Sequence, residues 1–154
     1  MKRMVRALFA ALCLCLALPG ARADEAVAPR VVPLVVVTAS GRQVEYRVEL
    51  AIGEAERRQG LMGRRSLDPQ AGMLFDFGTV QPIAMWMRNT YVALDMVFAD
   101  DAGIVVDVIA RTTPLSETLL MPRVPARYVL ELLAGQPAAR GIAIGDRLSI
   151  RTSP

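Results

Sequence analysis

The chain of 154 residues contains no histidine, and its two cysteines, Cys13 and Cys15, both lie near the N-terminus. The absence of histidine excludes Ser-His-Asp triads and the usual histidine ligation of zinc, copper or haem. If the N-terminal segment is removed, as argued below, the remaining chain also lacks thiol nucleophiles and disulfides. Such a domain must depend on its apolar core, and we expect it to hold no metal ion and no cofactor.

Lysine is nearly absent too, so arginine supplies almost all of the positive charge. The arginines are scattered along the chain, and no basic stripe with interleaved aromatic residues is present, so we expect no nucleic-acid partner. The net charge of +3 would fall to −1 on loss of four N-terminal residues, Lys2, Arg3, Arg6 and Arg22.

Residues 1–23 have the composition of a secretory signal peptide. Three basic residues precede an apolar stretch over residues 7–18, and Ala21-Arg22-Ala23 provides the small-x-small pattern at which signal peptidases cut. The apolar stretch is about a dozen residues long, which is short for a membrane-spanning helix. We predict an exported protein, periplasmic or secreted, without membrane attachment after cleavage; the alternative is an uncleaved membrane anchor.

The rest of the chain is long enough for one domain with its own apolar core. Residues 24–30 form a short leader of alanine, proline and charged residues, which we expect to be flexible. Residues 31–154 form the single predicted domain, without an internal repeat.

Alternation of apolar and polar residues predicts most of this domain to be strands. It is clearest where charged residues separate Val44, Tyr46, Val48 and Leu50. Residues 127–133 are ambiguous between strand and helix, and we favour a strand. The other strands are expected over residues 31–38, 72–77, 84–87, 93–99, 104–110 and 147–151.

Helix is expected in only two places. Residues 54–62 contain good helix formers with acids in the first turn, and residues 135–141 have room for one helical turn. Residues 112–125 hold three prolines and are expected to form a long loop. The predicted fold class is mainly β (α+β): a compact β-sandwich or barrel of short strands with one short helix packed against it.

Five groups of residues resemble the sequence signatures of a known family. The most recognisable group lies within residues 84–98 and consists of Trp86, Met87, Asn89, Thr90, Leu94 and Asp95. The other four groups are Glu56, Arg57, Gly60, Leu61, Met62 and Arg64; Gly72, Met73, Leu74 and Phe75; Val129, Leu130, Glu131, Leu132 and Gly135; and Gly145 and Asp146. Over residues 44–150 the chain resembles the bacterial and archaeal family called domain of unknown function 192. The resemblance implies a fold and a set of positions, without an activity. Gly53 departs from the family, in which a threonine-like helix cap is frequent at this position.

The signature residues include groups suited to binding a small ligand. Arg57 and Arg64 are seven residues apart and would lie on one side of a helix that reached Arg64. Their guanidinium groups match a carboxylate or phosphate. Asn89 and Thr90 at a bend can hydrogen-bond a ligand, and Trp86 offers a flat face for a sugar ring. The alternative for Asn89 and Thr90 is that they hold the bend together.

Asp95 and Glu131 could form a carboxylate pair for acid–base catalysis or for a hard cation. The alternatives are that Asp95 pairs with a buried arginine, Arg57 or Arg64, and that Glu131 is a cross-strand partner. Trp86 and several methionines are expected to fill the core, because methionine adapts to irregular gaps. These methionines are Met62, Met73, Met85, Met87 and Met96.

Three functions are compatible with these residues. The first is a cell-envelope module that binds a small anionic or sugar-like ligand through Arg57, Arg64, Trp86, Asn89, Thr90, Asp95 and Glu131. The second is a structural or protein-interaction domain, which an exposed apolar patch beside residues 112–125 would favour. The third is a hydrolase that uses Asp95 and Glu131. Whether the protein is an enzyme is left open by the sequence.

Overall fold

The computed structural model describes residues 28–150. The predicted signal peptide, residues 24–27 of the predicted leader, and the final residue of the last predicted strand, Arg151, lie outside this range. Within residues 28–150, no helix is both long and apolar enough to cross a membrane.

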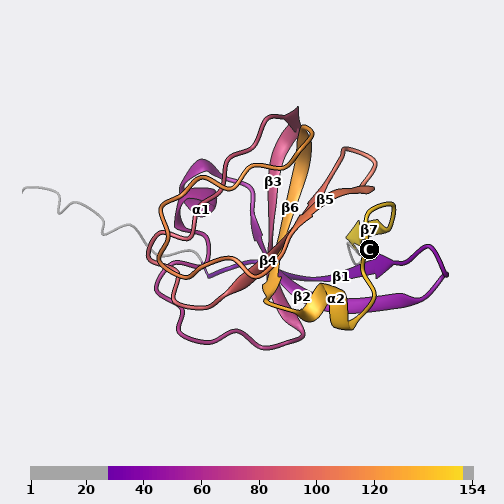
Figure 1. The fold of residues 1–154 in the computed structure, drawn as a ribbon, viewed down its shortest axis with the longest axis horizontal. Helices are drawn as coiled ribbons and strands as arrows, with labels where there is room; N and C mark the ends of the chain where they lie inside the picture. The colour runs from indigo at the N-terminus through magenta and orange to yellow at the C-terminus, as the bar shows by residue number, and fades with distance from the viewer. Residues whose placement is uncertain (1–27, 151–154) are drawn as a thin grey trace, which may run out of the picture.

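Seven strands form one sheet, in the order β5-β4-β6-β3-β2-β1-β7 (Figure 1). All neighbouring strands are antiparallel except β2 and β3, which are parallel. The strands are β1 (Val31–Val37), β2 (Gln43–Ala51), β3 (Ala71–Gln81), β4 (Leu94–Ala99), β5 (Val105–Ile109), β6 (Ala126–Leu133) and β7 (Arg147–Ile150).

The sheet curls into a half-barrel, and the mainly β class predicted from the sequence is confirmed. Backbone hydrogen bonds link the two ends of the sheet. Ile104, directly before β5, forms a bridge with Arg147 of β7, and the amide of Leu148 donates to the carbonyl of Gly103 at 2.7 Å. The curl follows from the twist of adjacent strands, which accumulates across seven strands.

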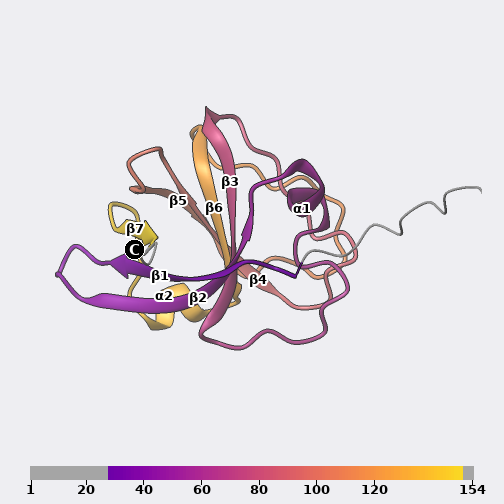
Figure 2. The ribbon, with the colours of Figure 1, turned by 180° about the vertical axis from the view of Figure 1, so that it is seen from behind.

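Two short helices accompany the sheet, α1 (Glu54–Gln59) and α2 (Gln136–Ala139). In Figures 1 and 2, α1 lies beside the long loops on one side of the point where the strands cross, and α2 lies on the other side and contacts β4 and β6. The prediction that α1 extends to Met62 is wrong, because Gly60 ends the helix with a φ of +47°. The predicted single turn within residues 135–141 is confirmed as α2.

The start of α1 is fixed although Gly53 has no capping side chain. The carboxylate of Glu56 accepts hydrogen bonds from the amides of Ile52 at 2.8 Å and Gly53 at 2.7 Å. These two bonds lower the pKa of Glu56 and satisfy donors that the helix leaves free. Glu56 therefore supplies the part of a capping box that bonds the amide before the helix, whereas the first-turn amide that a threonine at position 53 would bond has no side-chain cap from Gly53.

One predicted strand is absent. Residues 84–87 form only an isolated bridge, in which Met85 pairs with Leu120. Their alternating pattern instead places Met87 inside and Trp86 outside, on a segment that crosses one face of the sheet. The segment of residues 84–90 is held against residues 112–120 by backbone hydrogen bonds, including Met87 to Ser116 at 2.9 Å.

The strands alternate their side chains between two apolar cores, one on each face of the sheet. The first core includes Leu74, Val97, Leu130 and Leu132 and is enclosed by the curl. The second lies under α1 and the long loops and contains Leu61, Met73, Phe75, Ile83, Met87, Leu94, Met96, Phe98 and Val129. The candidate site opens from this second face.

Candidate functional site

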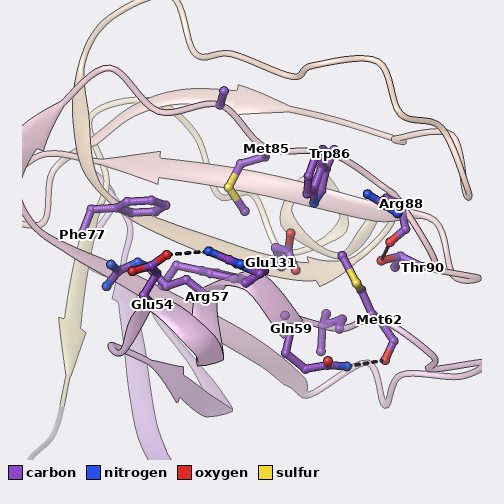
Figure 3. Close-up of a pocket in the computed structure, with 15 residues that line it drawn as sticks. Glu54, Arg57, Gln59, Met62, Phe77, Met85, Trp86, Arg88, Thr90 and Glu131 are labelled. Atoms are coloured by element: carbon purple, nitrogen blue, oxygen red, sulfur yellow. Dashed lines mark hydrogen bonds and ion pairs between the residues drawn. The ribbon is translucent and has the colours of Figure 1, made fainter.

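A pocket of about 220 Å³ lies between α1, the segment of residues 84–90, and the sheet (Figure 3). Its wall on the sheet side comes from β3 and β6, and its mouth lies between α1 and Trp86. A wider groove continues outward from the mouth past Ala55 and Asn89. The pocket is lined by Glu54, Arg57, Arg58, Gln59, Gly60, Leu61, Met62, Phe75, Phe77, Ala84, Met85, Trp86, Arg88, Thr90 and Glu131.

Glu131 is the one buried acidic group among these lining residues. It is only 4% exposed, and no hydrogen bond or ion pair to its side chain is present within residues 28–150. Its neighbours across the sheet are Met73 on β3 and Met96 on β4, so the predicted cross-strand polar partner is absent. Burial in this apolar setting raises the pKa of Glu131 to about 8.

Aromatic and thioether side chains form most of the remaining wall. Phe75 is buried, whereas Phe77, Met62 and Met85 are half-buried around the cavity. Trp86 is 41% exposed, so the prediction that it fills the core is wrong. It stands at the mouth, where it can contact a bound molecule.

Three arginines line the pocket, and each already has a partner. The Arg57 guanidinium lies 5.2 Å from the centre of the Phe77 ring and donates to the carbonyl oxygens of Ile52 and, at 3.0 Å, Asp76. The other two pair with acids: Arg58 with Glu54 at 2.5 Å, and Arg88 with Glu117 at 3.8 Å. Arg57 therefore forms no ion pair within residues 28–150, although its positive charge helps to lower the pKa values of Asp76 and Glu56.

Arg64 does not join Arg57, which corrects the prediction that both face one ligand. The helix ends at Gln59, so residues 60–64 turn away from the helical register. Arg64 instead pairs with Glu49 of β2, with 2.5 Å between Nη2 and Oε2.

Asn89 and Thr90 shape the bend beside the mouth. Asn89 has a φ of +55°, a conformation that asparagine tolerates better than most residues, and its carbonyl accepts a hydrogen bond from Gly63 at 2.8 Å. Thr90 is buried, and its hydroxyl donates to the carbonyl of Arg88 at 3.3 Å. Thr90 lines the pocket and Asn89 the outer groove, so each holds the bend and also borders the site.

Asp95 does not line the pocket, because its side chain lies on the other face of the sheet. Asp95 is opposite Leu132, whereas Glu131 is opposite Met96, so the two acids leave the sheet on opposite faces. Asp95 accepts hydrogen bonds from the backbone amides of Arg111 at 2.6 Å and Gly135 at 2.9 Å. The predicted arginine partner and the predicted acid–base pair with Glu131 are therefore both wrong.

The family model of domain of unknown function 192 (DUF192), described as "Uncharacterized ACR", matches residues 35–150. The chain belongs to the DUF192 family. The resemblance seen in the sequence is thereby confirmed. No curated protein matches the chain.

Two crystal structures are similar to this DUF192 domain. One, from Sinorhizobium meliloti 1021, is described as a suggested transcription regulator; it is 44% identical, has a TM-score of 0.78, and aligns over 80% of this chain and 96% of its own. The other, a protein of unknown function from Novosphingobium aromaticivorans, is 35% identical, has a TM-score of 0.74, and aligns over 81% of this chain and 94% of its own.

Several residues of the DUF192 pocket were not among the predicted site residues. Arg58 follows Arg57 and Arg88 lies between Trp86 and Asn89, so proximity to the signature residues was the available signal. Phe77 and Met85 also lie close to signature residues, Phe75 and Trp86, but an apolar side chain could as well fill the core, and their place in the pocket depends on how α1 packs against the sheet. Within residues 28–150, no group of three or more acidic, histidine or cysteine side chains could hold a metal ion.

Proposed function

We propose that this DUF192 domain is a small-ligand-binding module of the cell envelope, and that its ligand occupies the pocket over Glu131. The observation that carries the proposal is the burial of the Glu131 carboxyl group in a cavity without a protein partner. Within residues 28–150, the Tyr46 hydroxyl is the one side-chain polar atom that is both fully buried and unpaired, so the small exposed area of Glu131 leaves its carboxyl group accessible from the cavity. A ligand in the pocket can therefore supply the hydrogen bond that the protein does not give to Glu131.

The chemistry of the mouth favours an anionic or sugar-like ligand. Arg57 provides positive charge and forms no ion pair within residues 28–150, and Arg88 lies 5.8 Å from the centre of the Trp86 ring. An anionic group of the ligand would meet these guanidinium groups, and a sugar ring would stack on the indole face. The proposed export of the protein places such ligands within reach in the envelope.

A thermal-shift screen of the full chain tests this function. The panel contains sugars, muropeptide fragments, acidic metabolites, phosphates and divalent ions, and each is tested against the wild type and Glu131→Leu. A ligand at about 100 times its dissociation constant stabilises the protein by about 2.7 kcal/mol. The proposal requires a shift in the wild type that Glu131→Leu loses; a panel without any shift contradicts it.

An exposed apolar surface favours a protein-interaction domain as the second candidate. The loop that follows β5 exposes four apolar side chains to an extent of 45–58%, which are Leu115, Leu119, Met121 and Val124. Exposed apolar residues gathered on one loop are typical of contact surfaces. Sedimentation of the wild type and Leu119→Ser over a range of concentrations tests self-association; this candidate predicts an association that the variant weakens.

The charge distribution gives no support to nucleic-acid binding. The Sinorhizobium protein is described as a suggested transcription regulator. Residues 28–150 of this chain, however, contain as many acidic residues as arginines and no lysine. DNA binding depends on an excess of positive charge along one surface, so we propose no nucleic-acid partner for this chain.

A further inference from the structure

The surroundings of Glu131 determine which form of its carboxyl group the pocket stabilises. The neighbours on β3 and β4 are the apolar residues Met73, Phe75 and Met96, two of them thioethers and one aromatic. An ionised carboxylate in such a place loses its hydration without gaining a donor. The neutral acid keeps one O–H donor and loses far less on burial.

The charged groups that share the pocket do not neutralise Glu131. They come from α1 and from the segment of residues 84–90, and within residues 28–150 no ion pair joins any of them to Glu131. Arg57 is held by backbone carbonyl oxygens, and the remaining groups pair with one another or with Glu117. These charged groups are Glu54, Arg57, Arg58 and Arg88.

We propose that the buried end of the ligand is an uncharged group with an oxygen acceptor, such as a carbonyl or hydroxyl, and that Glu131 holds it as a carboxylic acid. In this arrangement the Glu131 O–H donates one hydrogen bond to the ligand oxygen. Any anionic part of the ligand remains at the mouth, beside Arg57 and Arg88. This inference rests on the proposed function and adds the polarity of the buried end to it.

If the buried end of the ligand were a protonated amine, Glu131 would have to bind it as a carboxylate. The aromatic wall would suit a cation, but Arg57 repels one, because it lines the pocket and forms no ion pair, unlike Arg58 and Arg88. An amine would also need the carboxyl group to lose its proton on binding. An uncharged acceptor requires no ionisation, and it satisfies the group that the protein leaves unpaired.

Three probes of nearly equal size separate these cases: acetophenone as the uncharged acceptor, benzylamine as the cation and benzoate as the anion. Binding to the full chain is followed through the indole N–H signal of Trp86 in NMR spectra, which is unambiguous because the chain has one tryptophan. The titrations are run between about pH 5 and about pH 9, on either side of the pKa of about 8. Wild type, Glu131→Gln and Glu131→Leu are compared.

The inference predicts that acetophenone binds the wild type at low pH and weakens about tenfold per pH unit above the Glu131 pKa. Glu131→Gln retains a donor, so it should bind acetophenone within about threefold of the wild type and without pH dependence. Glu131→Leu should lose at least about tenfold, the usual effect of one lost hydrogen bond.

Two other results overturn the inference while leaving the proposed function intact. One is benzylamine binding that strengthens with pH and disappears in Glu131→Gln, and the other is acetophenone binding that Glu131→Leu loses but that does not weaken as the pH rises to about 9. If none of the three probes binds at millimolar concentration at any pH, the inference and the proposed pocket fail together.

Discussion

Glu131 lies directly opposite Met96 on the neighbouring antiparallel strands β6 and β4. The two side chains therefore leave the sheet on the same face, and a carboxyl group is set among apolar residues. Glu131 is also paired with Met73 on its other side, so neither neighbouring strand offers it a donor. This placement accounts for the raised pKa of Glu131 and for the polar floor of the pocket.

The first prediction concerns stability against pH. Glu131 has an ordinary pKa of 4.5 and a folded-state pKa of about 8, because burial disfavours its charged form. Between these values the folded state holds a proton that the unfolded chain has released, so stability falls as pH rises. The stabilisation that comes from protonated Glu131 is complete below about pH 4.5 and lost above about pH 8. Between these values the free energy of unfolding falls by up to about 1.4 kcal/mol per pH unit. Urea unfolding at a series of pH values measures it.

Glu131→Gln and Glu131→Leu provide the controls for this dependence. Both should remove the slope between pH 4.5 and pH 8, and the leucine variant should be more stable than the wild type above this window. The reason is that an apolar side chain of similar volume has no charge to desolvate. An unchanged slope in both variants would assign the effect to another group.

The second prediction concerns Asp95. Its carboxylate accepts hydrogen bonds from the amides of Arg111 and Gly135, and it is 1% exposed. Asp95→Ala leaves these donors unpaired and should lower the free energy of unfolding by about 3 kcal/mol, as measured in urea. Asp101→Ala is the matched control at an exposed turn position and should change stability by less than about 0.5 kcal/mol. Equal stability of the two variants would contradict this role.

The third prediction concerns Gly72, which lies where β3 approaches β6 closely. A Cβ at this position would lie 2.5 Å from the carbonyl oxygen of Glu131 and 2.8 Å from Cδ2 of Leu132. Gly72→Ala should therefore destabilise the domain by about 2 kcal/mol, because the β3–β6 backbones must separate. A Cβ at Gly53 would have Oε2 of Glu56 as its nearest atom, at 3.4 Å, so Gly53→Ala should cost less than about 1 kcal/mol. Thermal unfolding of both variants measures this difference in stability. Similar melting temperatures for Gly72→Ala and Gly53→Ala would contradict the prediction.

The fourth prediction separates two exposed aromatic residues. Trp86 and Tyr91 both have an arginine over the ring, Arg88 at 5.8 Å and Arg65 at 4.5 Å, but only Trp86 lines the pocket. Trp86→Ala should weaken ligand binding about tenfold through lost ring contact, and Tyr91→Ala should leave it unchanged. Calorimetric titration measures both affinities. Equal losses would mean that the ligand lies outside the pocket.

Local sequence patterns predicted most of the strands, because a half-buried strand shows its alternation directly. The residues of β2 are an example, with Val44 and Tyr46 buried between exposed polar residues. The same alternation over residues 84–87 was misleading, since a segment crossing the face of a sheet also has an inner and an outer side. The end of α1 depends on the backbone conformation of Gly60. The good helix formers on either side of this glycine led to the prediction of a longer helix.

The site was only partly predictable from the sequence. Glu131, Arg57, Trp86 and Thr90 were selected by residue chemistry and do line one pocket. The sequence wrongly placed Asp95 in the same site, because the face of the sheet on which Asp95 lies follows from the pairing register of β4 with β6. Register is a tertiary property, and a sequence pattern does not state which residue lies opposite which.

The measurement that tests the central claim most directly is an NMR titration of isotope-labelled protein with the strongest ligand from the thermal-shift screen. The account predicts that the largest changes occur at the indole of Trp86, at the amides of α1, and on β6 around Glu131. Changes confined to the loop that holds Leu115 and Leu119, with the Trp86 indole unmoved, would contradict it and place binding on the exposed apolar surface.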